Sequence, residues 1–129
     1  MATYFPIDAG VEFDCVNSDL IGFDWLAGTA DFVIPQDSRR ALRVRFALVG
    51  VSRMLDEMTL SIETAPGVDR GLVPHHFAYR VEGSLFSDSA AARLWSEIFG
   101  PASHYCFVTG GGCLDVLTAV PPEFAVIPR

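Results

Sequence analysis

Three segments of this sequence alternate apolar and polar residues with a period of two, the pattern of a β-strand that buries one face. They cover residues 42–48, 58–62 and 77–82. The first is the clearest, with four apolar side chains on one face: Leu42, Val44, Phe46 and Leu48. A further apolar run, 30–34, ends at Pro35 and a polar turn. The sequence therefore predicts a protein built mainly from short strands.

Three consecutive glycines, residues 110–112, separate two further β-rich runs, 104–109 and 113–120. Glycine tolerates the positive φ angles that tight strand reversals need, so this pattern predicts a β-hairpin. We reject a phosphate-binding loop here, because such a loop leads into a helix and commonly uses a lysine. In this chain a strand follows the glycines, and there is no lysine. Residues 124–127 can add a last short strand.

One segment has the period of an amphipathic helix, and we expect it near residues 88–99. Ser87 or Asp88 can cap its start, and Gly100 followed by Pro101 is a stop signal. Its apolar side is formed by four residues: Leu94, Trp95, Ile98 and Phe99. We expect this side to be buried against one face of a sheet.

These elements predict an α+β fold, with a mostly antiparallel, curved β-sheet of about 7–9 short strands and one amphipathic helix packed on it. The chain has 129 residues, which is enough for one domain and too few for two. We therefore expect a single domain over residues 1–129.

Charge and composition exclude several classes of protein. The formal net charge is -7, which disfavours nucleic-acid binding because that binding depends on cationic side chains. No apolar stretch reaches the roughly 18 residues of a membrane span, and the start of the chain lacks the features of a secretory signal. The three cysteines are an odd number, which favours free thiols in a reducing compartment. We expect a cytoplasmic protein that uses no cofactor.

Four residues with reactive or metal-binding side chains flank the glycine turn: His104, Cys106, Cys113 and Asp115. Whether they share a face depends on the register of the hairpin. If Thr109 pairs with Gly112, Cys106 opposes Asp115 and all four side chains project together. If Thr109 pairs with Cys113, the two pairs lie on opposite faces.

The first register would make a zinc site or a thiol–imidazole pair geometrically conceivable. The close spacings of common zinc motifs are absent, so we expect no metal site and interpret both cysteines as small buried side chains. Neither register places Cys106 directly opposite Cys113, so we expect no disulfide between them. His104, Cys106 and Asp115 remain the catalytic candidates of this segment.

His75 and His76 precede the strand predicted at 77–82. Adjacent side chains of an extended chain point to opposite faces, so the two rings are not expected to hold one metal ion. Either ring can act as a catalytic base, but the sequence identifies no nucleophile or acid as its partner.

We expect a small non-enzymatic protein that acts by association, either with itself as a homodimer or with another protein. Apolar residues make up 50% of the chain, which is more than a domain of this size readily buries. Aromatic residues in loop-prone segments are the expected interface anchors: Phe5, Phe23 and Trp25.

Two other hypotheses belong to different classes. The first is a binding module for a small apolar or aromatic ligand held between helix and sheet. Four aromatic residues would line its pocket: Phe77, Tyr79, Trp95 and Phe107. The second is an enzyme that uses the cysteine and histidine candidates named above. The sequence carries no motif that assigns it to a known family.

Overall fold

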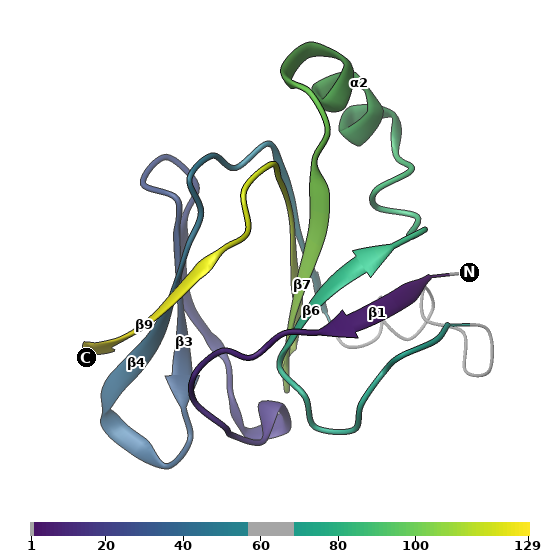
Figure 1. Ribbon diagram of the computed structural model, residues 1–129. Coiled ribbons are helices and arrows are strands. Elements are labelled where there is room, and N and C mark those ends of the chain that lie inside the picture. Colours follow the sequence, from purple (N-terminus) through teal and green to yellow (C-terminus); the bar gives the residue numbers. More distant parts are fainter. Residues whose placement is uncertain (1, 57–68) are drawn as a thin grey trace.

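The computed structural model describes residues 2–56 and 69–129, which form two antiparallel β-sheets packed face to face with one α-helix at the end of the sandwich (Figure 1). The described elements are β1 (Thr3–Pro6), η1 (Cys15–Asn17), β2 (Leu20–Asp24), β3 (Thr29–Ile34), β4 (Asp37–Arg45), β5 (Val51–Asp56), β6 (Ala78–Glu82), α2 (Ala90–Phe99), β7 (Ser103–Thr109), β8 (Gly112–Thr118) and β9 (Glu123–Pro128). One sheet has the order β1-β6-β7-β8-β5 and the other the order β2-β3-β4-β9. The α+β class with mostly antiparallel strands is confirmed, but the strands divide between two sheets.

The strand predictions hold where the alternation is inside a paired strand. Leu42 and Val44 in β4 are buried as expected, and so is Phe46, which directly follows the strand. Leu48 lies farther beyond the end of β4 at Arg45 and is exposed. Phe77 also departs from the expected alternation, because it precedes β6 and packs between the sheets. The strand expected at 58–62 lies outside the described residues.

The core between the two sheets is aromatic at its centre. Phe107 on β7 has ring centroids of three other phenylalanines within 6 Å: Phe32, Phe46 and Phe77. Aliphatic side chains from both sheets surround these rings, among them Leu42 and Val44 from one sheet and Leu114 and Val116 from the other. The inward faces of β3, β4, β7 and β8 together supply this core, and its apolar burial stabilises the fold.

The hairpin expected around the glycines is formed by β7 and β8, and Gly110 and Gly111 make its turn. Gly110 approaches η1 closely, since its N–H donates to the carbonyl of Ser18 at 3.1 Å. A Cβ atom at Gly110 would lie 2.1 Å from the carbonyl oxygen of Val16. No side chain fits there, which explains why this turn needs glycine.

The predicted helix is α2, and its limits agree with the expectation to within two residues. Ser89, rather than Ser87 or Asp88, caps its start, because the Ser89 side chain accepts the Ala92 N–H at 3.2 Å. Gly100 ends it with a φ of 98°, a conformation that favours glycine.

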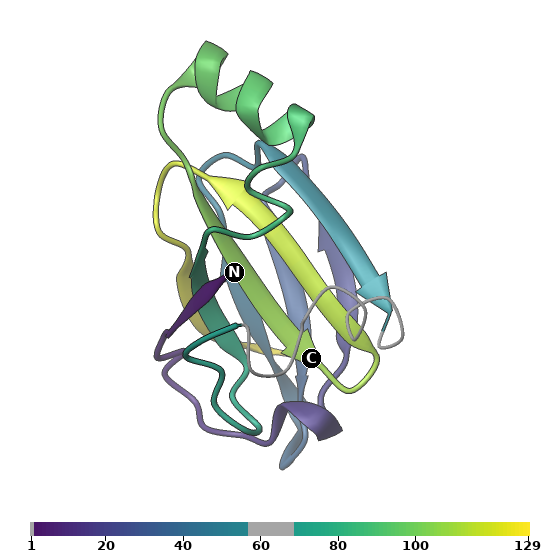
Figure 2. The same ribbon diagram turned by 90° about the vertical axis from the view of Figure 1, so that its right-hand side faces the viewer.

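The helix lies across the end of the sandwich rather than over a sheet face (Figure 2). Ala92 is buried and Trp95 packs on Gly50, but the other three side chains of the expected buried side are exposed: Leu94, Ile98 and Phe99. The sheet face near the helix is covered instead by the segment before it, where Phe86 is buried against His104. No helix among the described residues is long and apolar enough to cross a bilayer.

Substituting Phe107→Ala is expected to lower the free energy of unfolding by about 3–5 kcal/mol, because it empties the centre of the inter-sheet core. Val126→Ala, at a partly exposed position of β9, is the control and should cost less than about 1 kcal/mol. Urea unfolding of the three proteins measures both values. Similar losses for the two variants would contradict this assignment of the core.

Candidate functional site

The first register of the β7–β8 hairpin is the one observed. Thr109 pairs with Gly112 and Cys106 with Asp115, so His104, Cys106 and Asp115 share the outer face of the five-stranded sheet with Cys113. All four side chains are buried there, and both cysteines are free thiols. The structure therefore brings together the four residues that flank the glycine turn.

A buried carboxylate organises this face. His104 Nε2 lies 2.6 Å from Asp115 Oδ1, and Arg53 on β5 donates from Nε to Asp115 Oδ2 at 3.0 Å. On the other side of the ring, His104 Nδ1 lies 2.7 Å from the hydroxyl of Ser84. Ser84 in turn accepts the N–H of Ser87, which closes a turn just before α2. The cluster thus joins three strands to the segment that leads into the helix.

The ionisation of this cluster follows from its hydrogen bonds. Burial disfavours the charged form of Asp115, but the hydrogen bonds and charges of His104 and Arg53 outweigh it and hold the pKa of Asp115 below its ordinary value. The ionised carboxylate therefore accepts from both partners. The pKa of the Cys106 thiol is raised by its hydrogen bond with Cys113 and by burial, so Cys106 is a neutral thiol near neutral pH.

Ser84, His104 and Asp115 have the order hydroxyl, imidazole, carboxylate that hydrolases use. In a hydrolase triad the hydroxyl contacts Nε2 and the carboxylate contacts Nδ1, and here the two ring nitrogens are exchanged. Ser84 is only 7% exposed, and none of the three residues lines the groove between the loop after β1 and the loop before β6. The geometry favours a role in fixing the turn at residues 84–87.

Arg53 and Ser84 were not identified from the sequence. The Arg53–Asp115 bond joins residues 62 positions apart, and local patterns carry no signal for such a pairing. Arg53 also stacks on the ring of Phe86, with its guanidinium carbon 4.9 Å from the ring centroid. A basic residue beside the apolar pair Met54 and Leu55 was the available hint.

The two adjacent histidines bond to different segments. His75 Nδ1 lies 2.9 Å from Asp14 Oδ1, and His76 Nε2 lies 3.0 Å from the carbonyl oxygen of Ile7. His75 has a φ of 65°, which is unusual for a residue with a side chain. The pKa of Asp14 is lowered by the N–H of Val16 and then by His75. Asp14 is thus the partner of His75 that the sequence did not reveal.

These histidines line a groove of about 580 Å³ between the loop after β1 and the loop before β6.

The four aromatic residues predicted to line a ligand pocket are spread over the molecule. Phe77 and Phe107 contact each other between the sheets, Tyr79 lies on the outer face, and Trp95 lies on α2. The structure does not gather these four side chains around one pocket.

The expected interface aromatics have three different surroundings. Trp25 is 63% exposed in the β2–β3 turn. Phe5 is less exposed and lies under the guanidinium of Arg80, with 4.4 Å between the guanidinium carbon and the ring centroid. Phe23 packs against the inter-sheet core. Trp25 alone of the three is both large and mostly exposed.

Trp25 belongs to a larger exposed surface that we call the apolar end. The β2–β3, β4–β5 and β8–β9 connections and α2 lie at the same end of the sandwich (Figures 1 and 2). Their exposed apolar side chains are Trp25, Leu26, Leu48, Leu94, Ile98, Phe99 and Val120.

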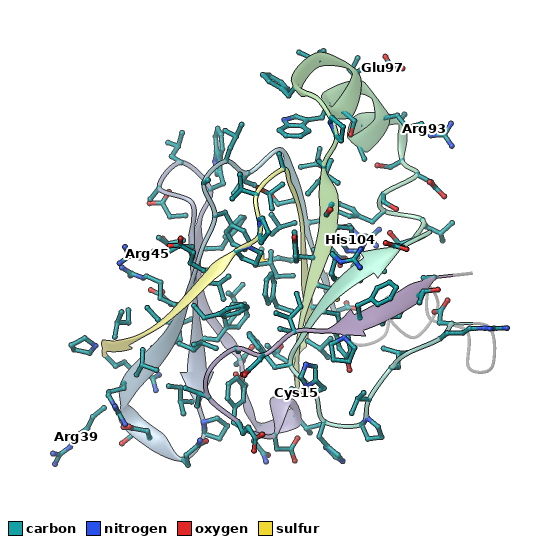
Figure 3. All side chains as sticks on the ribbon, in the orientation of Figure 1. Cys15, Arg39, Arg45, Arg93, Glu97 and His104 are labelled. Atoms are coloured by element: carbon teal, nitrogen blue, oxygen red, sulfur yellow. The ribbon has the colours of Figure 1, made fainter. Side chains whose placement is uncertain are left out.

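Contacts between these segments hold the apolar end together. The carbonyl of Gly28 accepts the Phe46 N–H at 2.8 Å, and the Gly50 N–H donates to the carbonyl of Leu117 at 2.8 Å. Gly50 also lies directly under the indole of Trp95. The charged side chains of α2, Arg93 and Glu97, point away from the sandwich (Figure 3).

Comparison of the chain with protein-family models, with curated proteins and with solved structures gives no match. The geometry of the sites is therefore the basis for a functional proposal.

Asp115→Asn is expected to lower the free energy of unfolding at pH 7 by about 3 kcal/mol, because it removes the buried carboxylate charge to which Arg53 and His104 are bonded. Since the pKa of Asp115 is lower in the folded than in the unfolded protein, its contribution is present above the unfolded pKa of about 3.9 and is lost as pH falls through the folded pKa. Urea unfolding of both proteins between pH 7 and pH 3 should show the difference shrinking toward acid. A difference that stays constant with pH would contradict the assignment.

Proposed function

We propose that this protein acts by association, and that its apolar end binds the apolar end of a second copy of the chain. The observation that carries this proposal is the gathering of exposed large apolar side chains on one end, with Leu26 80% and Ile98 65% exposed. Monomeric proteins rarely expose a contiguous apolar surface of this kind, because water contact with it is unfavourable.

The arrangement of α2 favours a second copy as the occupant. Leu94 and Ile98 are one helical turn apart and lie beside the residues that pack on the sandwich. A two-fold axis near the middle of α2 would pair two helices antiparallel, with Leu94 of one copy against Ile98 of the other. Such an interface is self-complementary, which is the property that a symmetric dimer requires.

Charge and size are compatible with this pairing. Although the chain carries a net charge of -7, α2 has one cation and one anion, Arg93 and Glu97, so two paired helices bring no net charge into contact. The helix and the three connections together supply a number of residues comparable to the roughly 20–30 per side of a standard interface. The three free thiols fit a reducing compartment, and we place this association in the cytoplasm.

Replacing Ile98 by Glu is expected to dissociate the dimer, because pairing would then bury a carboxylate against an apolar surface. Light scattering coupled to size exclusion should give twice the 14.0 kDa chain mass for the natural protein. The dissociation constant of Ile98→Glu should be raised by about 30-fold or more, as at an interface hot spot of about 2 kcal/mol.

Val16→Glu is the matched control, since it adds the same charge at an exposed apolar side chain of η1, at the opposite end of the sandwich. This variant should dimerise like the natural protein. A single-chain mass for the natural protein at every attainable concentration, or equal weakening by both variants, would refute the proposal. A monomer that instead captures a different protein through this end would also refute it.

A further inference from the structure

We propose that Cys106, Cys113 and Asp115 bind one divalent transition-metal ion with the ligand preferences of Zn²⁺. The ligand atoms of these three residues, two Sγ atoms and a carboxylate oxygen, all lie within 4.8 Å of one another. All three side chains are buried on the outer face of the five-stranded sheet. This site is distinct from the apolar end and does not depend on its proposed role.

The spacing suits a tetrahedral ion. With zinc–sulfur bonds near 2.3 Å and zinc–oxygen bonds near 2.0–2.2 Å, neighbouring ligand atoms are roughly 3.5–3.8 Å apart. Cys113 Sγ lies 3.7 Å from Asp115 Oδ2, which is within this range. Cys106 Sγ lies within 4.8 Å of the other two ligand atoms. Three protein ligands would leave one position of a tetrahedral ion for a fourth ligand.

The charge of the cluster also suits a divalent ion. The negative charge of Asp115 already faces the cation Arg53, 3.0 Å away. Binding breaks two S–H bonds, forms two S–metal bonds and releases two protons to solvent, with no change of oxidation state. One dication replaces two protons, so the net charge of the buried cluster stays the same. The desolvation cost that excludes an unbalanced buried ion is thereby avoided.

The groups around Asp115 hold it in a position to bind. His104 Nε2 lies 2.6 Å from Asp115 Oδ1, and Arg53 Nε donates to Asp115 Oδ2 at 3.0 Å. A carboxylate oxygen has two lone pairs, so Oδ2 can accept from Arg53 and still bind a metal. Hydrogen-bonded partners of this kind orient the ligands of metal sites and raise their affinity. Two thiolates select Zn²⁺ over Mg²⁺ and Ca²⁺, which prefer oxygen ligands alone.

The test is a titration of the reduced, metal-free chain with Zn²⁺ and, separately, with Co²⁺, whose thiolate complexes absorb in the near ultraviolet. We expect saturation at one ion per chain and the thiolate–cobalt absorption band. Native mass spectrometry should show the mass of one zinc ion added and two protons lost. Absence of stoichiometric binding by the natural protein would overturn the proposal without recourse to any variant.

Cys106→Ser and Cys113→Ser should each lower the zinc affinity by at least about 100-fold. This loss is larger than the one expected when only a residue that hydrogen-bonds to a metal ligand is replaced. Cys15→Ser is the matched control, because Cys15 is the remaining buried thiol and lies in η1, away from the cluster. It should bind as the natural protein does. Binding that survives both cluster substitutions, or that is lost in Cys15→Ser, would assign the ion to another place and refute the site.

Discussion

The register of the β7–β8 hairpin is the constraint on which the rest of the structure depends. With Thr109 opposite Gly112, Phe107, Leu114 and Val116 point between the sheets. The four residues of the buried cluster then share the outer face: His104, Cys106, Cys113 and Asp115. A slip of one residue in β8 would exchange the two faces of that strand and point Asp115 at the phenylalanine rings between the sheets. Two features oppose that slip, namely the close contact of Gly110 with η1 and the bond between His104 and Asp115.

Local pattern was sufficient to predict the elements whose side chains alternate within one paired strand or repeat within one helix. The strand at Leu42 and Val44, the glycine hairpin and α2 were found in this way, because each is determined by neighbours in the chain. The register of the hairpin could not be chosen from the sequence, because two-residue and three-residue turns are both compatible with three glycines. The partners Arg53 and Ser84 were missed for a related reason, since only the packing of distant strands brings them to Asp115 and His104.

The helix illustrates how tertiary packing overrides an amphipathic pattern. The four apolar positions on α2 predicted a face buried on a sheet, but the segment at residues 83–89 occupies that place. The Phe86 ring packs against His104, and the guanidinium of Arg53 stacks on the same Phe86 ring. The helix is therefore displaced to the end of the sandwich, where only part of its apolar surface finds a neighbour. Each apolar side chain left exposed there forgoes about 1.5–3 kcal/mol of burial, which association can recover.

The buried cluster and the apolar end are connected through this same segment. At one end of the segment at residues 83–89, Ser84 is hydrogen-bonded to His104, and at the other end Ser89 caps α2. Only residues 85–89 therefore separate the cluster from the helix. The position of the helix on the sandwich then depends on two anchors, the packing of Trp95 on Gly50 and the hydrogen bonds that hold the turn at residues 84–87. The hydrogen bonds of this turn continue from Ser84 through His104 to the ionised Asp115. The polar cluster on the outer sheet face therefore helps to position α2 and the apolar end to which α2 belongs.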